Sequence, residues 1–179
     1  MTNFQELLDA YEAHRERLHA YRAECRGFCL KLATGFAKYL GVEYLGKEMR
    51  FYPPDQVFDP NDTHRYNALG GMLWMDDSFF HLTFALVLKD AVLVPDWISY
   101  GWLFKKEGDH FIVQDELSRT KMKIPAEEGQ EQSEKLEAFY NSVMQETIEG
   151  IEKSLANFLV QGSDANPIGF QFSLDTDAT

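Results

Sequence analysis

Apolar residues recur at helical spacing along residues 3–40. Starting at Phe4, an apolar or aromatic residue occurs at every seventh position up to Tyr39, and a second series follows the first by three residues. This near-heptad pattern predicts a helix that ends at Gly41, because glycine is favoured just beyond a helix end. As one rod it would be about 57 Å long at about 1.5 Å per residue, longer than a small domain needs. Gly27 offers a break, so the sequence favours a helix pair over one helix.

The middle of the chain alternates between apolar and polar residues, which is the pattern of half-buried strands. Polar turn residues at 76–78, 89–90 and 106–109 separate these segments. The expected strands are residues 43–52, 66–75, 79–88, 92–104 and 110–114, the last of which could continue to Ile124. Short connections of this kind join antiparallel neighbours, so the sequence predicts a five-stranded antiparallel meander.

A second helical pattern covers about residues 130–160, with apolar residues on one face and glutamates on the other. Gly162 is the expected stop, and residues 163–179 form a mostly polar tail in which Ile168–Leu174 could add a short edge strand. The chain is therefore predicted to be an α+β protein with an N-terminal helix or helix pair, the meander, and a long C-terminal helix packed on the sheet. We expect one domain over residues 1–162, followed by the tail.

The composition is that of an ordinary globular protein, because 45% of the 179 residues are hydrophobic and 26% are charged. No apolar stretch approaches the roughly 20 residues that cross a bilayer, so no membrane association is expected. The first residues carry acids within their apolar pattern, unlike a signal peptide. Cys25 and Cys29 are the only cysteines, too few for a disulfide framework. These features predict a cytoplasmic protein.

The net charge of −12 is concentrated towards the C-terminus. Residues 126–179 contain eleven acids against Lys135 and Lys153, a balance of −9, whereas the first forty residues are nearly neutral. Such a chain repels phosphate backbones, so nucleic acid is not an expected partner. The acidic helix could be a docking face for a basic protein, but a solvated face that keeps the protein soluble is the favoured interpretation.

The sequence lacks motifs that identify a reaction or a metal. The glycine pair 70–71 enters a strand, whereas a phosphate-binding loop leads into a helix. Cys25, Cys29 and His14 on one helix cannot surround a zinc ion, which needs four ligands within about 2.3 Å. Segment 59–63 resembles the start of a calcium loop, but the loop's later glycine and glutamate are missing. We therefore expect no metal and no cofactor.

His81 is the candidate for chemistry, because it lies mid-strand beside Thr83 on the face opposite Phe80. On a face that forms a pocket it could act as a general base or orient a ligand. A histidine hydrogen-bonded within a half-buried sheet is the favoured interpretation, so catalysis is not the expected activity. If the sheet and the C-terminal helix enclose a ligand, the residues expected to bind it are Arg50, Tyr66, Trp74, His81, Trp97 and Trp102.

Both faces of the predicted sheet carry large apolar residues, as the alternation of Trp97 and Leu103 with Tyr100 and Trp102 shows. A sheet covered on one face normally has polar residues on the other, so helices, a second subunit, a partner segment or an apolar ligand must cover the second face. The favoured function is a homodimeric, cytoplasmic protein-interaction module of the chaperone, immunity, adaptor or secretion-accessory type. The alternative is a small apolar-ligand-binding protein, or an enzyme, with a pocket between the sheet and the C-terminal helix.

Overall fold

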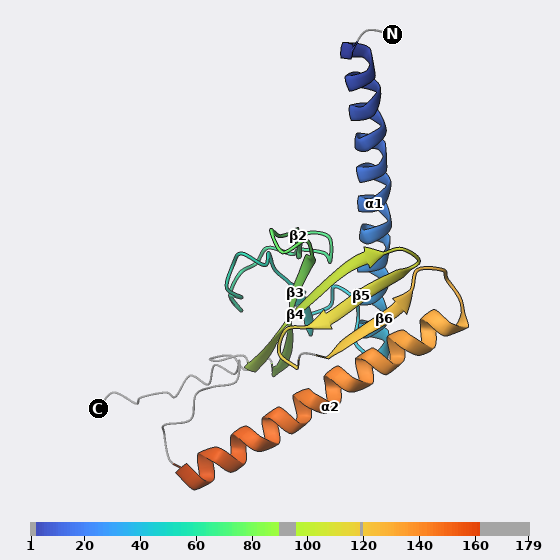
Figure 1. The fold of residues 1–179 in the computed structure, drawn as a ribbon. Coiled ribbons are helices and arrows are strands. Elements are labelled where there is room, and N and C mark those ends of the chain that lie inside the picture. The colour runs from blue at the N-terminus through green and yellow to red at the C-terminus, as the bar shows by residue number, and fades with distance from the viewer. Residues whose placement is uncertain (1–2, 90–95, 119, 162–179) are drawn as a thin grey trace.

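The computed structural model describes residues 3–89, 96–118 and 120–161, and it has the predicted α+β order (Figure 1). The elements are α1 (Asn3–Leu40), β1 (Met49–Phe51), β2 (Met72–Trp74), β3 (Phe80–Lys89), β4 (Asp96–Glu107), β5 (His110–Asp115), β6 (Lys121–Pro125) and α2 (Gln130–Gln161). Neither described helix has a stretch that is long and apolar enough to span a bilayer. The expected edge strand at Ile168–Leu174 lies outside the described residues.

All six strands belong to one antiparallel sheet. β3, β4, β5 and β6 follow one another as the predicted meander. β1 and β2 instead share one edge of β3, where Met49 of β1 pairs with Leu86 and Trp74 of β2 pairs with Phe80. The first strand therefore lies beside β3 and not beside the second strand of the chain.

Two expected strands are shorter than their patterns predict, and one is divided. Of residues 43–52 only β1 is extended, because Leu45 adopts a φ of 65° in the preceding turn and cannot join a ladder. Of residues 66–75 only β2 is extended, because the Gly71 amide donates back to the Asn67 carbonyl in a turn. The expected last strand is two strands, β5 and β6, joined by a tight connection.

α1 is one continuous helix, so the prediction of a break at Gly27 is wrong. Gly27 faces open space, while Cys25, Phe28 and Cys29 are buried on the other side of the helix. Since these residues share one packed face, a break would pull part of that face out of the core. The loss would exceed the roughly 1 kcal/mol that glycine costs within a helix.

Both helices pack on the same face of the sheet, and the core lies between the two layers. Phe36 of α1 is at its centre, with ring contacts to Phe84, Tyr100, Trp102 and Tyr140. These residues come from α1, two neighbouring strands and α2, so one aromatic cluster joins every layer of the fold. Burial of each large side chain contributes about 1.5–3 kcal/mol to this packing.

The loop after β1 covers part of the sheet's other face. Phe58 of this loop is 7% exposed, and its ring lies 5.6 Å from that of Trp97 and 5.4 Å from that of Tyr52. The guanidinium of Arg50 lies over the Phe58 ring at 5.1 Å, a cation–π contact. Part of the apolar second face is therefore covered by the chain itself.

Candidate functional site

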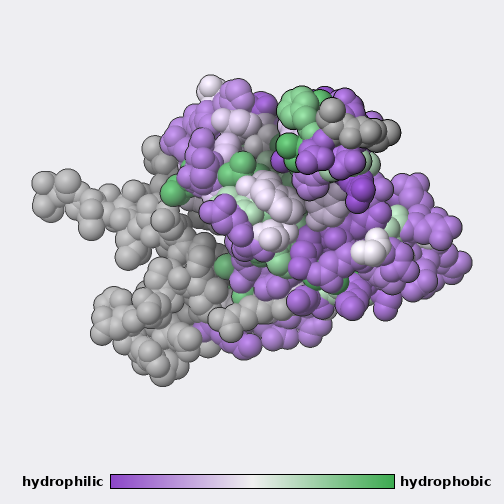
Figure 2. Space-filling view, turned by 45° about the horizontal axis from the view of Figure 1, so that its top comes forward, coloured by the Kyte–Doolittle hydropathy of each residue, from purple (hydrophilic) through white to green (hydrophobic). Residues whose placement is uncertain are grey.

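The first half of α1 extends beyond the sheet with no other part of the fold beside it (Figure 1). Residues 3–20, here called the projecting half of α1, are exposed except for the partly buried Ala13. Figure 2 views the molecule from the side of this projection and shows hydrophobic residues within a mostly hydrophilic surface. The residues of its apolar stripe, with their exposed fractions, are Phe4 (67%), Leu7 (65%), Tyr11 (59%) and Leu18 (36%).

Tyr21 marks the point where α1 leaves the body of the protein. Its ring lies 6.1 Å from that of Trp74, edge to face, and 6.4 Å from that of Phe80. The backbone N–H of Lys106 donates to its hydroxyl at 3.3 Å. Trp74 is itself 43% exposed. The apolar stripe of the projecting half, in which His14 is the one polar position, therefore leads into an aromatic cluster on the sheet.

Charges are placed unevenly around the projecting half of α1. Arg15 and Arg17 occupy the helix positions on either side of the stripe, and Arg22 follows one turn later. The acids Glu6, Asp9, Glu12 and Glu16 lie farther from the stripe, and all but Glu16 are in the first two thirds of the segment. The basic groups thus flank the apolar surface near the body of the protein, and acids accompany it towards the tip.

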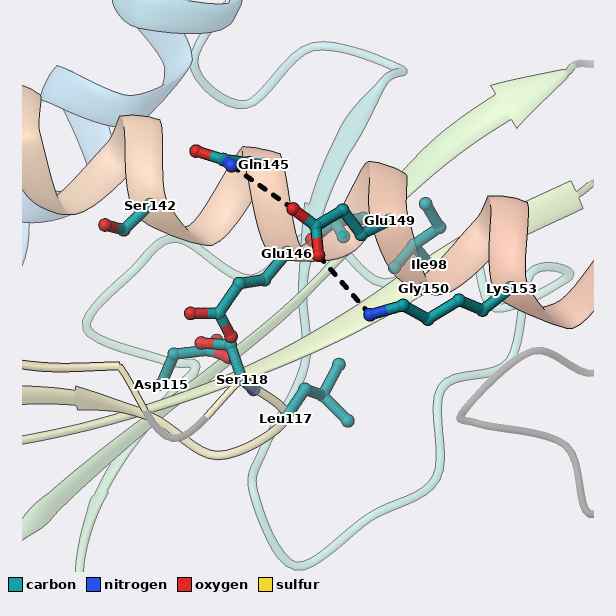
Figure 3. A pocket seen from close by; sticks show the side chains of 11 residues that line it. Ile98, Asp115, Leu117, Ser118, Ser142, Gln145, Glu146, Glu149, Gly150 and Lys153 are labelled. Carbon is teal, nitrogen blue, oxygen red and sulfur yellow. Dashed lines mark hydrogen bonds and ion pairs between the residues drawn. The ribbon is translucent and has the colours of Figure 1, made fainter.

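A cleft of about 580 Å³ separates α2 from the end of the sheet (Figure 3). Ile98 and Leu117 form its apolar part. Most of the residues that line it are polar, with carboxylates and hydroxyls from Asp115, Glu146, Glu149, Ser118, Ser142 and Thr147. The space between the sheet and the C-terminal helix is therefore more polar than the apolar pocket that the sequence suggests as the alternative site.

Asp115, the last residue of β5, is 1% exposed and lines this cleft. Its Oδ2 accepts a hydrogen bond of 2.6 Å from the Ser118 amide, whereas its Oδ1 has no hydrogen-bond partner among the described residues. The Asp115 N–H donates to the Thr120 carbonyl at 2.9 Å, and the Thr120 hydroxyl donates to Glu146 at 2.7 Å. The turn between β5 and β6 thereby brings two carboxylates to one end of the cleft.

His81 lies on the face of the sheet that is opposite to the two helices, whereas this cleft lies on the side of α2. Its Nε2 is 2.8 Å from Oδ2 of Asp77, and its Nδ1 is 3.4 Å from Oε1 of Glu116. Slight burial opposes the effect, but hydrogen bonds from the Phe79 amide and the His81 ring lower the pKa of Asp77 below its ordinary value. Both ring nitrogens of His81 thus face carboxylates.

Arg50 and Tyr66, two of the expected ligand-binding residues, line one small groove of about 220 Å³ beside β1. The Arg50 guanidinium donates to the Pro60 carbonyl at 2.6 Å and to that of Asp62, so the adjoining loop holds it in place. The Tyr66 ring lies 4.2 Å from that of His64. The groove thus brings two of the six expected residues together, and Arg50 and Trp97 both contact the Phe58 ring.

The three tryptophans lie in different surroundings. Trp102 is fully buried in the core, and its Nε1 has no hydrogen-bond partner among the described residues. Trp97 packs under the loop on the outer face, and Trp74 lies beside Tyr21. None of the six expected residues lines the cleft at α2. The sequence gives no signal for Asp115, because an acid between a strand and a turn is ordinary there.

No family model matches this chain, and no curated protein or solved structure shows significant similarity to it.

Proposed function

We propose that this chain is a homodimeric protein-interaction module of the cytoplasm, held together by the projecting halves of two α1 helices. The observation that carries the proposal is a helix that leaves the fold with its apolar stripe in solvent. This segment is about 27 Å long at about 1.5 Å per residue. Helices of this length are marginal in water without packing, so the projecting half needs a surface to contact.

A second copy of the projecting half is the partner that fits the pattern best. The heptad spacing that buries α1 against its own sheet continues to the tip with His14 as the one polar residue of the stripe in the projecting half, and this spacing is what two helices need to pack side by side. Burying the stripes of both copies would contribute on the order of 10 kcal/mol. Association costs about 4–15 kcal/mol, so we expect a dimer of moderate affinity.

The charges favour an antiparallel pair. A parallel pair would set Arg17 of each helix against Arg22 of the other, on both sides of the seam. An antiparallel pair that places Leu7 beside Leu18 of the second copy brings Arg17 next to Glu6 of that copy. The same alignment brings Arg15 next to Glu12 of that copy, so repulsion is replaced by attraction.

The antiparallel alignment would also cover the exposed aromatic residues at the base of α1. When Leu7 lies beside Leu18 of the second copy, Phe4 lies beside Tyr21 of that copy. The Tyr21 ring contacts Trp74, which is 43% exposed. The tip of one helix would therefore cover the aromatic cluster of the other, and the acidic face of α2 would stay free for a further protein partner.

The thiols agree with a cytoplasmic location. Cys25 and Cys29 are both free and buried, as expected in a reducing compartment. Chaperone, immunity, adaptor and secretion-accessory roles all suit a dimer of this design.

Cysteine cross-linking tests the arrangement. Proteins carrying Leu7→Cys or Leu18→Cys are treated with a short bis-maleimide, each alone and after mixing and subunit exchange. In the antiparallel dimer identical positions are about 16 Å apart along the axis, so only the mixture should give a covalent dimer. Cross-linking of Leu7→Cys to itself would instead show a parallel pair, and no cross-link in any sample would contradict the dimer.

Sedimentation velocity gives the oligomeric state and a matched control. The wild type should sediment as a dimer at micromolar concentration, and Leu7→Lys with Leu18→Lys should make it monomeric. Ala20→Lys with Ala23→Lys adds the same charge on the exposed, opposite side of α1 and should leave the dimer intact. A wild type that stays monomeric, or equal effects of the two pairs, would refute the proposal.

A further inference from the structure

β6 is the last strand of the sheet, and among the described residues no strand lies along its outer edge (Figure 1). The Asp115 N–H donates to the Thr120 carbonyl, so even-numbered residues of β6 bond to β5 along the antiparallel ladder. The backbone N–H and C=O groups of Lys121 and Lys123 therefore point away from β5. Within the described part of the chain these groups have no hydrogen-bond partner. This stretch of edge is ready to pair with a further strand.

The side chains of the two lysines decide which strand can lie there. Ile124 is buried in the core, so Lys121 and Lys123 lie on the other face of the sheet, where both are exposed. Lys105 of the same face pairs with Glu107 at 2.5 Å. Neither lysine of β6 forms an ion pair with any residue that the structure describes. Lysines on an edge strand oppose pairing with strands that carry no compensating charge, so this edge selects an acidic strand.

We propose that the chain's own C-terminal segment, residues 168–177, adds to the edge of β6 as a parallel strand, with Asp175 beside Lys121 and Asp177 beside Lys123. This segment lies outside the described residues. Its sequence alternates apolar residues up to Leu174 with small or polar ones, which is the pattern of a half-buried strand. Its two aspartates have the same spacing as the two lysines, so both charge pairs form on one face. The edge of β6 contains no residue of the projecting half of α1, so it is separate from the proposed dimer interface.

The course of α2 sets the direction and the reach of the segment. Gln132, near the start of α2, donates to the Pro125 carbonyl at the end of β6, and Glu146 accepts from the Thr120 hydroxyl just before β6 begins. A segment that returns from the end of α2 therefore runs parallel to β6, as in a strand–helix–strand unit. Gln161 is about 22 Å beyond Glu146 along the helix at about 1.5 Å per residue. The extended chain from Gln161 to the first aspartate spans up to about 46 Å, which is enough for the return.

The apolar part of the segment also has surfaces to cover. In the parallel alignment Leu174 faces the same side of the sheet as Met122 and Ile124, which pack in the core. Phe172 comes earlier in the segment and lies level with the turn that precedes β6. Leu117 of this turn is 50% exposed. The segment would therefore bury apolar side chains on one face while it pairs charges on the other.

Hydrogen exchange of the full chain, followed by NMR, tests whether the edge is paired. The amides of Lys121 and Lys123 should exchange at least about tenfold more slowly than exposed amides, because the added strand accepts hydrogen bonds from them. Exchange of both amides at the rate of exposed backbone would overturn the proposal.

Carbodiimide cross-linking, which joins a lysine ammonium to a carboxylate in contact with it, identifies what occupies the edge. Mass spectrometry should find Lys121 or Lys123 joined to Asp175 or Asp177. In an equal mixture of ¹⁵N-labelled and unlabelled protein, these links should join peptides of the same isotope only. Links between labelled and unlabelled peptides would show that the segment of a second copy occupies the edge, and would refute pairing within one chain. Links of the two aspartates to other lysines alone, or no link to positions 121 and 123, would also refute it.

Charge reversal separates the proposed pairs from the general field of the protein. Lys121→Glu with Lys123→Glu should abolish the slow exchange at these two positions, and the fold should persist because both side chains are exposed. Lys38→Glu with Lys47→Glu makes the same change in charge at two exposed positions away from β6 and should leave the exchange unchanged. Equal loss of protection in both variants would reduce the effect to net charge and overturn the proposal.

A charge swap completes the test. Asp175→Lys with Asp177→Lys, added to the variant with Lys121→Glu and Lys123→Glu, reverses both members of each pair and should restore the slow exchange. If protection does not return, the lysines of β6 act on something other than the C-terminal segment, and the proposal is wrong.

Discussion

The ring of Tyr21 meets that of Trp74 edge to face, with centroids 6.1 Å apart, close to the point where α1 projects beyond the sheet. The two residues come from elements that are more than fifty positions apart in the chain. Their contact fixes the boundary between the part of α1 that belongs to the core and the part that is free to bind a partner.

Replacing Tyr21 should therefore loosen the base of α1. Tyr21→Ala removes a half-buried ring from Trp74 and Phe80 and should lower the free energy of unfolding by about 1–2 kcal/mol. Urea denaturation of the protein measures this change. Val57→Ala truncates a side chain that is 85% exposed and should change stability by less than about 0.5 kcal/mol. An equal effect of both variants would contradict the anchoring role of Tyr21.

Gly35 is required by the close approach of the two helices. A Cβ at this position would lie 2.5 Å from the Tyr140 hydroxyl, which donates to the Leu32 carbonyl in the buried helix interface. Gly35→Ala should thus destabilise the protein by about 1–3 kcal/mol. Gly27→Ala meets open space and should stabilise it by up to about 1 kcal/mol. Thermal denaturation of the two variants should move the midpoint in opposite directions.

The thiols of α1 should be protected in the native protein. Burial, followed by the effect of Cys25, raises the pKa of Cys29 to about 12, so the reactive thiolate is scarce at neutral pH. Ellman's reagent at about pH 8 should label neither cysteine until denaturant is added. Because the pKa is raised in the folded state, this contribution to stability is complete below the unfolded value near 9 and is lost as the pH rises towards about 12. Rapid labelling of the native protein would contradict the buried placement.

The Asp77–His81 pair should add a small, pH-dependent contribution to stability. The pKa of Asp77 is lowered in the folded state, so its contribution is present above the unfolded value of about 3.9 and is lost as the pH falls through the folded value. Asp77 is nearly half exposed, so Asp77→Asn should cost less than about 1 kcal/mol at pH 6. The difference from wild type should vanish near pH 2, whereas Asp76→Asn should show little difference at either pH. A difference that persists near pH 2 would point to a role other than charge.

The sequence by itself determined the class of fold, because helix and strand spacing are local properties of the chain. The heptad pattern of residues 3–40, the alternation in the middle and the amphipathic pattern after residue 130 each correspond to an element of the structure. The hairpins β3–β4 and β4–β5 followed from turn residues alone, whereas the division of the last expected strand into β5 and β6 did not. These local patterns do not depend on contacts between residues that are distant in the chain.

Tertiary structure decided which of these patterns is buried. The apolar stripe has the same spacing on both sides of Tyr21, yet Phe28 is buried and Leu7 is 65% exposed, because the sheet reaches only one half of the helix. Gly27 does not interrupt α1 because it faces away from the core, and the pairing of β1 with β3 joins segments that are distant in the chain. The cleft around Asp115 arises where α2 passes the end of the sheet, and the packing angle of a helix is not encoded in any local pattern.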